Sequence, residues 1–352
     1  MKRKLASIQI VKELIPIEGA DFIEECSVEG WGTIVKKGDF KVEDRCVWFE
    51  IDSILPAMPW SEFLEKKKYR VKTMKMRGVL SQGVALPLSI LNGPNPKRSI
   101  WDRIMRRDGW KIGADATDFL GVRKFDEETQ GTYKFGFNTG KTLSAFPAFV
   151  PKTDETRIQS CLSLLHEIKG LPFYASVKLD GTSATFAKRD NKFYICSRGR
   201  TVQQGEDDVY NRIARLYDIE TKLPDGLAIQ GEICGPGIRR NRLGLKDIDF
   251  FLFDVFDISA GKYLGLREMT DLADRMGLKT VPIDKIVVDK EAARFEHTKD
   301  NWLELAKGKY VGTKNNREGL VVRPLVNTYS RRLRGRLSFK IINNDYLLKE
   351  DK

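Results

Sequence analysis

A polar, glycine-rich stretch without hydrophobic periodicity divides this chain of 352 residues into two parts. The stretch covers residues 126–144 and reads DEETQGTYKFGFNTGKTLS. It offers neither a helix nor a strand a continuous face to bury, which is typical of a linker. The parts on either side are each long enough to bury a hydrophobic core of their own. We therefore predict two domains, at residues 1–125 and 145–352, joined by a linker at 126–144.

The first part contains short apolar segments separated by Gly and Pro over residues 6–91. This spacing of short strands is typical of a small closed β-barrel. The following segment, 92–115, is rich in turn formers and basic residues, and we predict one short helix within it, at 99–107.

The second part is predicted to combine helices with many strands. An apolar stripe of Ile158, Leu162, Leu165 and Ile168 predicts a helix over 153–168. Two further helices are predicted at 207–216 and 266–276. The remaining apolar segments are predicted to be strands, and they read FYASVKLDG, TSATFAKRDN, KFYICSRG, LAIQGEIC, DFFLFDVFD, EGLVVRPL and LSFKIIN.

The charge and the counts of single residue types limit the partners and the catalytic groups that this chain can use. The chain has 61 Lys and Arg against 49 Asp and Glu, a net charge of +12, which favours an acidic partner such as nucleic acid but also fits a basic protein that binds none. The five cysteines include no CxxC pair, so we expect neither a zinc ribbon nor a disulfide framework. Only two histidines are present, which favours lysine or carboxylate chemistry. No apolar run is long enough to span a bilayer and charges open the chain, so we expect no membrane association and an intracellular location.

The sequence KLDG at residues 178–181 ends an apolar segment and has two interpretations. Asp-Gly is common in tight hairpin turns, so a solvated hairpin is one of them. The other depends on the short motifs that follow in order, namely SRG at 197–199, GE at 231–232, FD at 253–254, EGLVV at 318–322 and SFK at 338–340. This ordered series resembles motifs I, Ia, III, IIIa, IV and V of the covalent nucleotidyltransferase superfamily, which includes ATP-dependent ligases and mRNA-capping guanylyltransferases.

The resemblance implies that Lys178 is the nucleophile that takes a nucleotide on its side-chain amine. A lysine attacks phosphorus only when it is unprotonated, and a neighbouring divalent cation lowers its pKa from the usual value of about 10.4. The resemblance assigns this cation, Mg²⁺ or Mn²⁺, to Asp180 and Glu318.

The same resemblance assigns the nucleotide contacts. Arg198 and Lys340 would offset charge on the phosphate oxygens. Glu232 would accept hydrogen bonds from the ribose, and Phe253, or Phe251 on the same face, would stack on adenine. Many ligases have Lys-x-Lys at motif V, whereas this chain has Ser or Ile at the two positions that could supply the second lysine.

Three features favour the RNA ligase branch. Ser183 stands where DNA ligases and capping enzymes have Arg, and only twelve residues follow Lys340, so we expect no C-terminal OB domain of the kind those enzymes carry. The phrase FPAFVPKTDETRIQ at 146–159 is similar to Naegleria-type RNA ligases, and it places Lys152 and Thr153 among the nucleotide-binding residues.

In that branch an OB domain precedes the catalytic domain. The resemblance thus implies an α+β protein with an N-terminal OB-fold β-barrel that binds nucleic acid. Its C-terminal part would be a nucleotidyltransferase (ATP-grasp-like ligase) domain of antiparallel sheets and helices. Two basic runs are candidates for phosphate contact, at 66–77 beside Trp31, Trp48 and Tyr69, and at 331–336. For both runs a solvated face is an open alternative.

The implied activity is an ATP-dependent RNA ligase that joins 3′-hydroxyl and 5′-phosphate ends through lysyl-AMP and RNA-adenylate. We expect a monomer that acts on nicked duplexes or other RNA ends. Two alternatives remain open: a GTP-dependent guanylyltransferase with the same lysine chemistry, and a nucleic-acid-binding protein of the OB type without catalysis.

Overall fold

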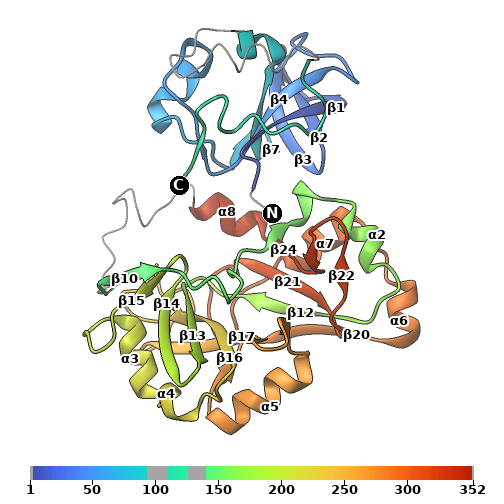
Figure 1. The fold of residues 1–352 in the computed structure, drawn as a ribbon. Coiled ribbons are helices and arrows are strands. Elements are labelled where there is room, and N and C mark those ends of the chain that lie inside the picture. The colour runs from blue at the N-terminus through green and yellow to red at the C-terminus, as the bar shows by residue number, and fades with distance from the viewer. Residues whose placement is uncertain (1–2, 93–108, 126–139, 351–352) are drawn as a thin grey trace. The chain divides into compact units, whose positions relative to one another are not determined.

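The structure, a computed structural model, describes residues 3–92, 109–125 and 140–350 (Figure 1). The predicted helix at 99–107 and most of the predicted linker lie outside the described residues. The chain forms two compact units. The first contains residues 1–132, 159–162 and 347–352, and the second contains 133–158 and 163–346.

The core of the first unit is a curled antiparallel sheet with the strand order β3-β2-β1-β4-β8. Its strands are β1 (Ala6–Pro16), β2 (Ile23–Val28), β3 (Trp31–Lys36), β4 (Arg45–Glu50) and β8 (Gly83–Pro87). The first half of β1 pairs with β4 and the second half with β2, and the register shift between Val11 and Glu13 lets the long strand bend. The two edges approach each other where the Gln82 amide donates to the Gly32 carbonyl at 2.9 Å. The predicted OB-type barrel is therefore confirmed.

Shorter elements complete the first unit, namely β5 (Ser53–Ile54), η1 (Pro59–Lys67), β6 (Met74–Met76), β7 (Val79–Ser81), η2 (Leu88–Asn92) and β9 (Arg123–Lys124). Trp31 and Trp48 are 1% and 2% exposed. Because both rings are buried in the barrel core, they cannot stack on a bound strand. The core interpretation of these two tryptophans is thus the correct one.

An eight-stranded sheet forms one half of the second unit (Figure 1). Its strands are β10 (Thr142–Ala145), β13 (Thr182–Arg189), β14 (Lys192–Ser197), β15 (Arg200–Val202), β16 (Leu227–Cys234), β17 (Asp249–Asp257), β18 (Lys262–Tyr263) and β19 (Lys279–Thr280). Apolar side chains of α3 (Val209–Leu216), α4 (Ile219–Lys222) and α5 (Leu266–Met276) cover one face of this sheet and form a single core with it. The helices predicted at 207–216 and 266–276 are thus confirmed.

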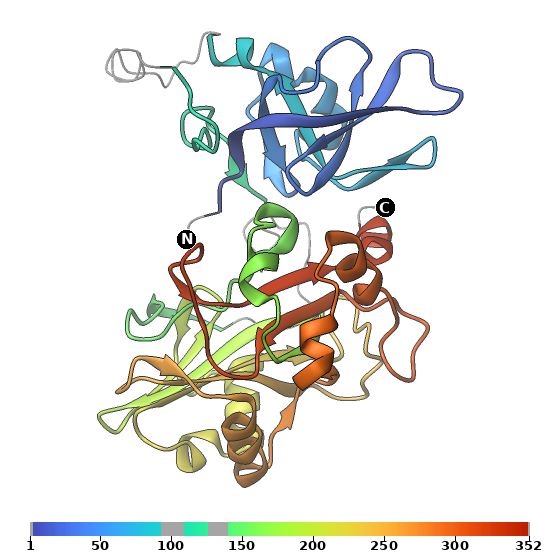
Figure 2. The same cartoon turned by 90° about the vertical axis from the view of Figure 1, so that its right-hand side faces the viewer.

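A five-stranded sheet with the order β11-β24-β21-β12-β20 forms the other half (Figure 2). Its strands are β11 (Thr156–Arg157), β12 (Phe173–Lys178), β20 (Ile283–Val287), β21 (Gly319–Pro324) and β24 (Phe339–Ile342). The helix α7 (Lys299–Ala306) packs on it through Trp302, whose ring meets Phe339 edge to face. The remaining elements are α2 (Leu164–Ile168), α6 (Asp289–Arg294), β22 (Tyr329–Ser330), β23 (Gly335–Arg336) and α8 (Asn344–Glu350).

The long helix predicted at 153–168 is wrong. This segment forms β11, a 3₁₀ turn η3 (Ile158–Ser160) and the short α2. Two of the four stripe residues, Ile158 and Ile168, are fully buried, but they belong to different elements, η3 and α2. Parallel pairing of β11 with β24 outweighs the local helical pattern.

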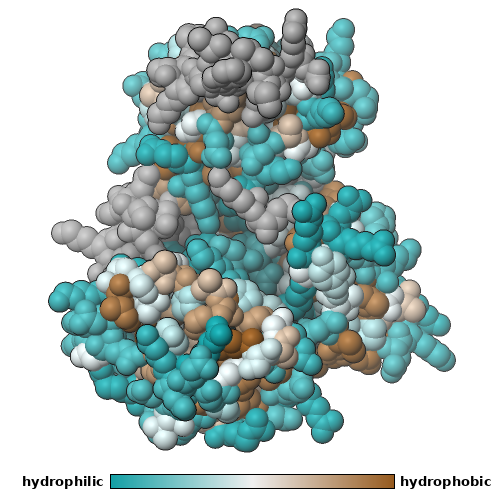
Figure 3. All heavy atoms as spheres, in the orientation of Figure 1, coloured by the Kyte–Doolittle hydropathy of each residue, from teal (hydrophilic) through white to brown (hydrophobic). Residues whose placement is uncertain are grey.

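Hydrophilic residues cover most of the face in Figure 3, and hydrophobic ones lie between them in small groups. Among the helices that the structure describes, none has the length and apolarity needed to cross a membrane.

Candidate active site

The KLDG sequence connects the two sheets of the second unit. Lys178 ends β12, and Thr182 begins β13, which belongs to the other sheet. The hairpin interpretation is therefore wrong, because β12 and β13 do not pair with each other. Gly181 is required here, since a Cβ atom on it would lie 2.2 Å from the carbonyl oxygen of Ile233. The connection brings the candidate nucleophile to the boundary between the sheets.

Lys178 contacts the motif IV carboxylate directly. Its Nζ donates to Oε2 of Glu318 at 2.8 Å, and the two side chains remain 24% and 18% exposed. The strand register explains the contact, because Lys178 pairs with Gly319 at the start of β21. Burial alone would lower the pKa of Lys178, but the negative charges of Glu318, Glu232 and Asp180 outweigh it and raise the pKa. In this state the lysine is protonated and is not yet a nucleophile.

Tyr310 holds the backbone of both residues. Its hydroxyl donates to the carbonyl of Lys178 at 3.0 Å and accepts from the amide of Glu318 at 3.1 Å. The side chain is 5% exposed, so these two bonds are shielded from water. The hydroxyl therefore fixes the ends of β12 and β21 relative to each other.

Asp180 is buried beside an arginine. Its Oδ2 lies 3.0 Å from Nε of Arg242, and Tyr346 donates a side-chain hydrogen bond to it. Arg242 in turn lies over the Tyr346 ring, 4.7 Å from the centroid. Burial, aided by the charge of Glu318, raises the pKa of Asp180 to about 6. The carboxylate is thus only partly stabilised by the cations around it.

Glu232 lies on β16, opposite Ser183 of β13. Its Oε1 accepts from the Gly181 amide at 3.1 Å. Burial raises the pKa of Glu232 to about 8, although the charge of Lys178 opposes this effect. We call Lys178, Asp180, Glu232, Arg242 and Glu318 the nucleophile cluster.

The donors of this cluster fit a divalent cation that arrives with phosphates. Within the described ranges, no group of three or more His, Cys, Asp or Glu side chains is arranged to hold a metal ion alone. Mg²⁺, however, usually binds one or two carboxylates together with substrate phosphates and water. Asp180 and Glu318 supply such a pair of hard oxygen donors, and each now contacts a cationic side chain.

A β-bulge orients Phe253. The register of β16 with β17 shifts between Gln230 and Gly231, which leaves Phe253 as the extra residue. Leu252 before it packs in the core under the helices, whereas Phe253 packs on the cluster that contains Leu179 and Tyr310. The ring is half-buried beside the nucleophile cluster, as an adenine-stacking residue requires.

Lys340 faces the same side of the five-stranded sheet as Lys178. It lies opposite Val321 on β21, which lies opposite Ser176 on β12. Directly opposed residues share a face, and side chains alternate along a strand, so Ser176, Lys178 and Lys340 point to one side. Ser338, at one of the two positions that could supply a second motif V lysine, is buried, and its hydroxyl has no hydrogen-bond partner in the described part of the chain.

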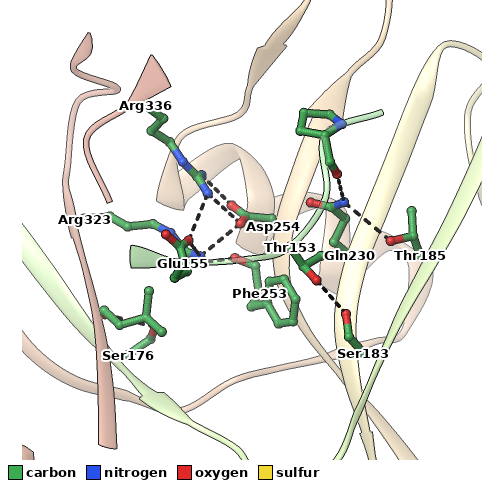
Figure 4. Close-up of polar contacts among 12 residues, drawn as sticks. Thr153, Glu155, Ser176, Ser183, Thr185, Gln230, Phe253, Asp254, Arg323 and Arg336 are labelled. Atoms are coloured by element: carbon green, nitrogen blue, oxygen red, sulfur yellow. Dashed lines mark hydrogen bonds and ion pairs between the residues drawn. The ribbon is translucent and has the colours of Figure 1, made fainter. Parts of the chain in front are cut away.

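The remaining predicted contacts lie at the rim of the eight-stranded sheet. Arg198 lies in the turn between β14 and β15, and it pairs with Asp154 at 2.5 Å. The Thr153 hydroxyl lies 2.9 Å from that of Ser183 (Figure 4). Lys152 is exposed. The structure thus places Thr153 near Glu232 through Ser183, and it gives Lys152 no comparable contact with the cluster.

A second buried set of charges lies beside Phe253 (Figure 4). Asp254 accepts two hydrogen bonds from Arg336, at 2.6 and 2.7 Å, and one from Arg323 at 3.0 Å. Arg323 also donates to Glu155 at 3.0 Å. We call Glu155, Asp254, Arg323 and Arg336 the arginine cluster.

The arginine cluster joins the two sheets, since Asp254 comes from β17 and Arg323 from β21. Burial alone would raise the pKa of Asp254, but the charges of Arg323 and Arg336 outweigh it and lower the pKa. The guanidinium of Arg336 also lies 3.6 Å from the ring centroid of Tyr263. The prediction that the basic run at 331–336 contacts phosphate is therefore wrong for Arg336. The three other arginines of the run are exposed.

Sequence reasoning missed Tyr310, Arg242, Tyr346 and the arginine cluster. Tyr310 and Arg242 lie in irregular loops, where no periodicity indicates which side chain points inward. Asp254 directly follows Phe253, and strict alternation would have placed the two on opposite faces. The bulge that brings both to the same side left no sequence signal.

Comparisons with known proteins agree with this geometry. The sequence matches the family model for RNA ligases over residues 171–342, and a model of an OB-fold domain matches residues 5–88. No curated protein matches at significant similarity.

Solved structures of Naegleria gruberi RNA ligase match over almost the whole chain. A glutamate-to-alanine mutant with AMP and Mn has a TM-score of 0.84 and 33% identity, covering 99% of this chain and 100% of that one. A lysine-to-alanine mutant with ATP and Mn has a TM-score of 0.83 and 34% identity, covering 99% and 100%. The enzyme with PPi has a TM-score of 0.83 and 34% identity, again covering 99% and 100%. Similarity of this extent, in both the barrel and the nucleotidyltransferase unit, shows that the chain belongs to the RNA ligase family.

Proposed function

We propose that this protein is an ATP-dependent RNA ligase that seals 3′-hydroxyl and 5′-phosphate ends, chiefly nicks in duplexes. The observation that supports this best is the contact of Lys178 with Glu318 at 2.8 Å, within a cluster that holds two further carboxylates. The matched Naegleria enzyme is seen with ATP, with AMP, with Mn and with PPi. A lysine beside carboxylates is suited to attack the α-phosphate of a nucleotide, because the divalent cation that binds with the nucleotide offsets the charge of those carboxylates.

In the first step the unprotonated Nζ of Lys178 attacks the α-phosphorus of ATP. The nitrogen–phosphorus bond forms as the bond to the bridging oxygen breaks, and pyrophosphate leaves. Lys178 must first give up one ammonium proton, either to Glu318, to which it now donates a hydrogen bond, or to water. A divalent cation bound by Asp180 and Glu318 would favour this loss by repelling the ammonium charge, and it would offset charge on the phosphates.

Other side chains orient the nucleotide. Phe253 would stack on the adenine, and Glu232 would accept from the ribose hydroxyls. Lys340, on the same face as the nucleophile, and Arg198 at the rim would contact phosphate oxygens. Lys152 and Thr153 would complete the pocket edge. Such alignment and charge neutralisation account for most of the catalysis in phosphoryl transfer.

In the second step an oxygen of the RNA 5′-phosphate attacks the phosphorus of lysyl-AMP. The nitrogen–phosphorus bond breaks, and the amine of Lys178 takes up a proton again. In the third step the 3′-hydroxyl attacks the 5′-phosphate, and AMP leaves as the phosphodiester forms. None of the three steps needs a histidine, in keeping with the presence of only two in the chain.

For the domain limits we propose a nucleic-acid-binding OB domain at 1–125, a linker at 126–144 and a catalytic domain at 145–352, although the eight-stranded sheet of the second unit already begins at Thr142. We also propose a monomeric enzyme in an intracellular compartment. All five cysteines are free, and four of them are buried, which is typical of proteins from reducing compartments.

Labelled nucleotide tests the covalent step. Purified protein is incubated with a divalent ion and either α-labelled ATP or α-labelled GTP, and the adduct is mapped by mass spectrometry. We expect AMP on Lys178, no adduct in Lys178→Ala, and full labelling in a control, Lys192→Ala, which removes an exposed lysine. Labelling by GTP alone would identify a guanylyltransferase. Absence of any adduct, with RNA binding intact, would identify a binding protein instead.

Nicked duplexes test the substrate. The strands on the two sides of the nick are exchanged between RNA and DNA, and sealing is followed on gels. We expect sealing wherever the 3′-hydroxyl strand is RNA. Sealing of all-DNA nicks without sealing of any RNA end would reject the RNA ligase proposal.

A further inference from the structure

A hairpin-like loop precedes motif IV and extends from the active site. The Tyr310 amide donates to the Asn315 carbonyl at 3.0 Å, and the Arg317 amide donates to the Gly308 carbonyl at 3.0 Å. An antiparallel bridge joins Lys309 to Asn316. We call residues 308–317 the motif IV hairpin.

The base of the motif IV hairpin is anchored. Tyr310 bonds the backbone of Lys178 and Glu318, as described above. Arg317 is buried, donates to the carbonyl of Ala306 at 3.2 Å and pairs with Asp284. The base is therefore fixed to the nucleophile cluster on one side and to the sheet on the other.

The tip of the motif IV hairpin exposes side chains that contribute little to the stability of the fold. Val311 is 94% exposed, so its side chain adds almost nothing to the core. Lys314 in the tip and Lys309 at the base are both exposed, and neither forms an ion pair with any carboxylate that the structure describes. An anchored base that carries exposed apolar and basic side chains is typical of a surface that binds another molecule.

A second basic loop adjoins the tip. The Asn315 side chain donates to the Arg242 carbonyl at 2.8 Å, and Gly244 lies beside Thr313. This loop, residues 235–246, follows β16, which carries Glu232. It exposes Arg240 and Lys246, while one exposed acid, Asp247, lies next to it.

The two loops thus place Lys309, Lys314, Arg240 and Lys246 on adjoining exposed segments. Loop 235–246 begins at the end of β16, which carries Glu232, and the motif IV hairpin ends directly before Glu318 and β21. Exposed cations beside a site that acts on a phosphate end are suited to the neighbouring phosphates of the same strand, and an exposed valine is suited to the shallow minor groove of A-form RNA.

We propose that the motif IV hairpin and loop 235–246 form a docking surface for the phosphate backbone of duplex RNA next to the end being sealed. This inference rests on the proposed ligase function. The exposed arginines at 331–334 are also basic, but they lack a buried anchor in the nucleophile cluster, so the hairpin is the better candidate for positioning the RNA end.

The test uses the full chain and a nicked RNA duplex. Binding is measured by fluorescence anisotropy over a range of salt concentrations for the wild type and for Lys309→Ala/Lys314→Ala. We expect binding about tenfold weaker at low salt, and a slope of log K against log salt that is smaller by about 2. The matched control, Lys262→Ala/Lys290→Ala, removes two exposed lysines from other elements and should retain both affinity and slope.

A second measurement separates this inference from the ligase proposal. Adenylylation by ATP without RNA should proceed at the wild-type rate in Lys309→Ala/Lys314→Ala, because the substitutions leave the nucleophile cluster intact, whereas the KM for nicked RNA should rise about tenfold. Normal adenylylation with unchanged RNA affinity and slope would overturn the docking surface alone, as would equal weakening in the control. Failure of the wild type to adenylylate would instead overturn the ligase proposal.

Discussion

The two buried charge clusters of the catalytic unit have opposite electrostatic character. The nucleophile cluster sets three carboxylates against two cationic side chains, and two of its acids have raised pKa values, about 8 for Glu232 and about 6 for Asp180. The arginine cluster sets two carboxylates against two guanidiniums, and the pKa of Asp254 is lowered. One cluster has an excess of negative charge, and the other is balanced.

This difference indicates which cluster is structural and which is poised for a ligand. A hydrogen-bonded set of balanced buried charges needs no ligand to be stable. Removing one member of such a set causes the largest loss in the free energy of unfolding. An excess of buried carboxylate is unfavourable until positive charge arrives, and a nucleotide with its divalent cation would supply that charge. The predictions below test this contrast between the clusters.

The largest effect is expected in the arginine cluster. Among the residues that the structure describes, Asp254→Asn would leave Arg323 and Arg336 with Glu155 as their one acidic partner, inside a site where Asp254 is 4% exposed. We expect a loss of about 3–5 kcal/mol in the free energy of unfolding, measured by urea denaturation.

Asp300→Asn is the control for this substitution, because the Asp300 side chain is 86% exposed and pairs with a surface lysine. It should change stability by less than about 1 kcal/mol. Similar losses in the two variants would show that the arginine cluster has no special structural role.

The nucleophile cluster should respond in the opposite direction. Glu232 has a folded pKa of about 8 against an ordinary value of 4.5, so the folded state holds its proton more tightly than the unfolded chain does. Stability from this group is therefore present below pH 4.5 and is lost as pH rises towards 8. Without nucleotide or metal, Glu232→Gln should raise the free energy of unfolding by roughly 1–3 kcal/mol near pH 8 and have little effect near pH 4.

The pH dependence itself is the discriminating result for Glu232→Gln. A difference from the wild type that stays constant between pH 4 and 8, or a less stable variant at pH 8, would contradict an excess of negative charge in the cluster. Glu304→Gln removes an exposed carboxylate and should show no such trend.

The sequence contained enough to predict one of these clusters and not the other. Lys178, Asp180, Glu232 and Glu318 lie in short motifs whose order is typical of the family, on or directly beside predicted strands. The structure brings these four together. Arg242, which balances Asp180, lies in an irregular loop where sequence pattern says nothing about direction.

The arginine cluster depends on details that periodicity does not encode. Arg336 stands in a run of exposed arginines, and only its contact with Asp254 of β17 shows that its side chain is largely covered. Asp254 reaches it because of the bulge at Phe253. Likewise, the stripe at 153–168 predicted a helix because local pattern could not foresee the pairing of β11 with β24.

The smallest effect is expected at Tyr310, which supports the nucleophile cluster through the backbone and not through charge. Tyr310→Phe would leave the buried Lys178 carbonyl and Glu318 amide without their partner, so stability should fall by about 1–2 kcal/mol. The nucleophile would also be held less firmly against Glu318, and single-turnover adenylylation should slow about tenfold, equivalent to about 1.4 kcal/mol. Tyr329→Phe, at a 67% exposed position, is the control and should change neither quantity. Adenylylation at the wild-type rate in a destabilised Tyr310→Phe would show that the hydroxyl stabilises the fold without positioning the lysine.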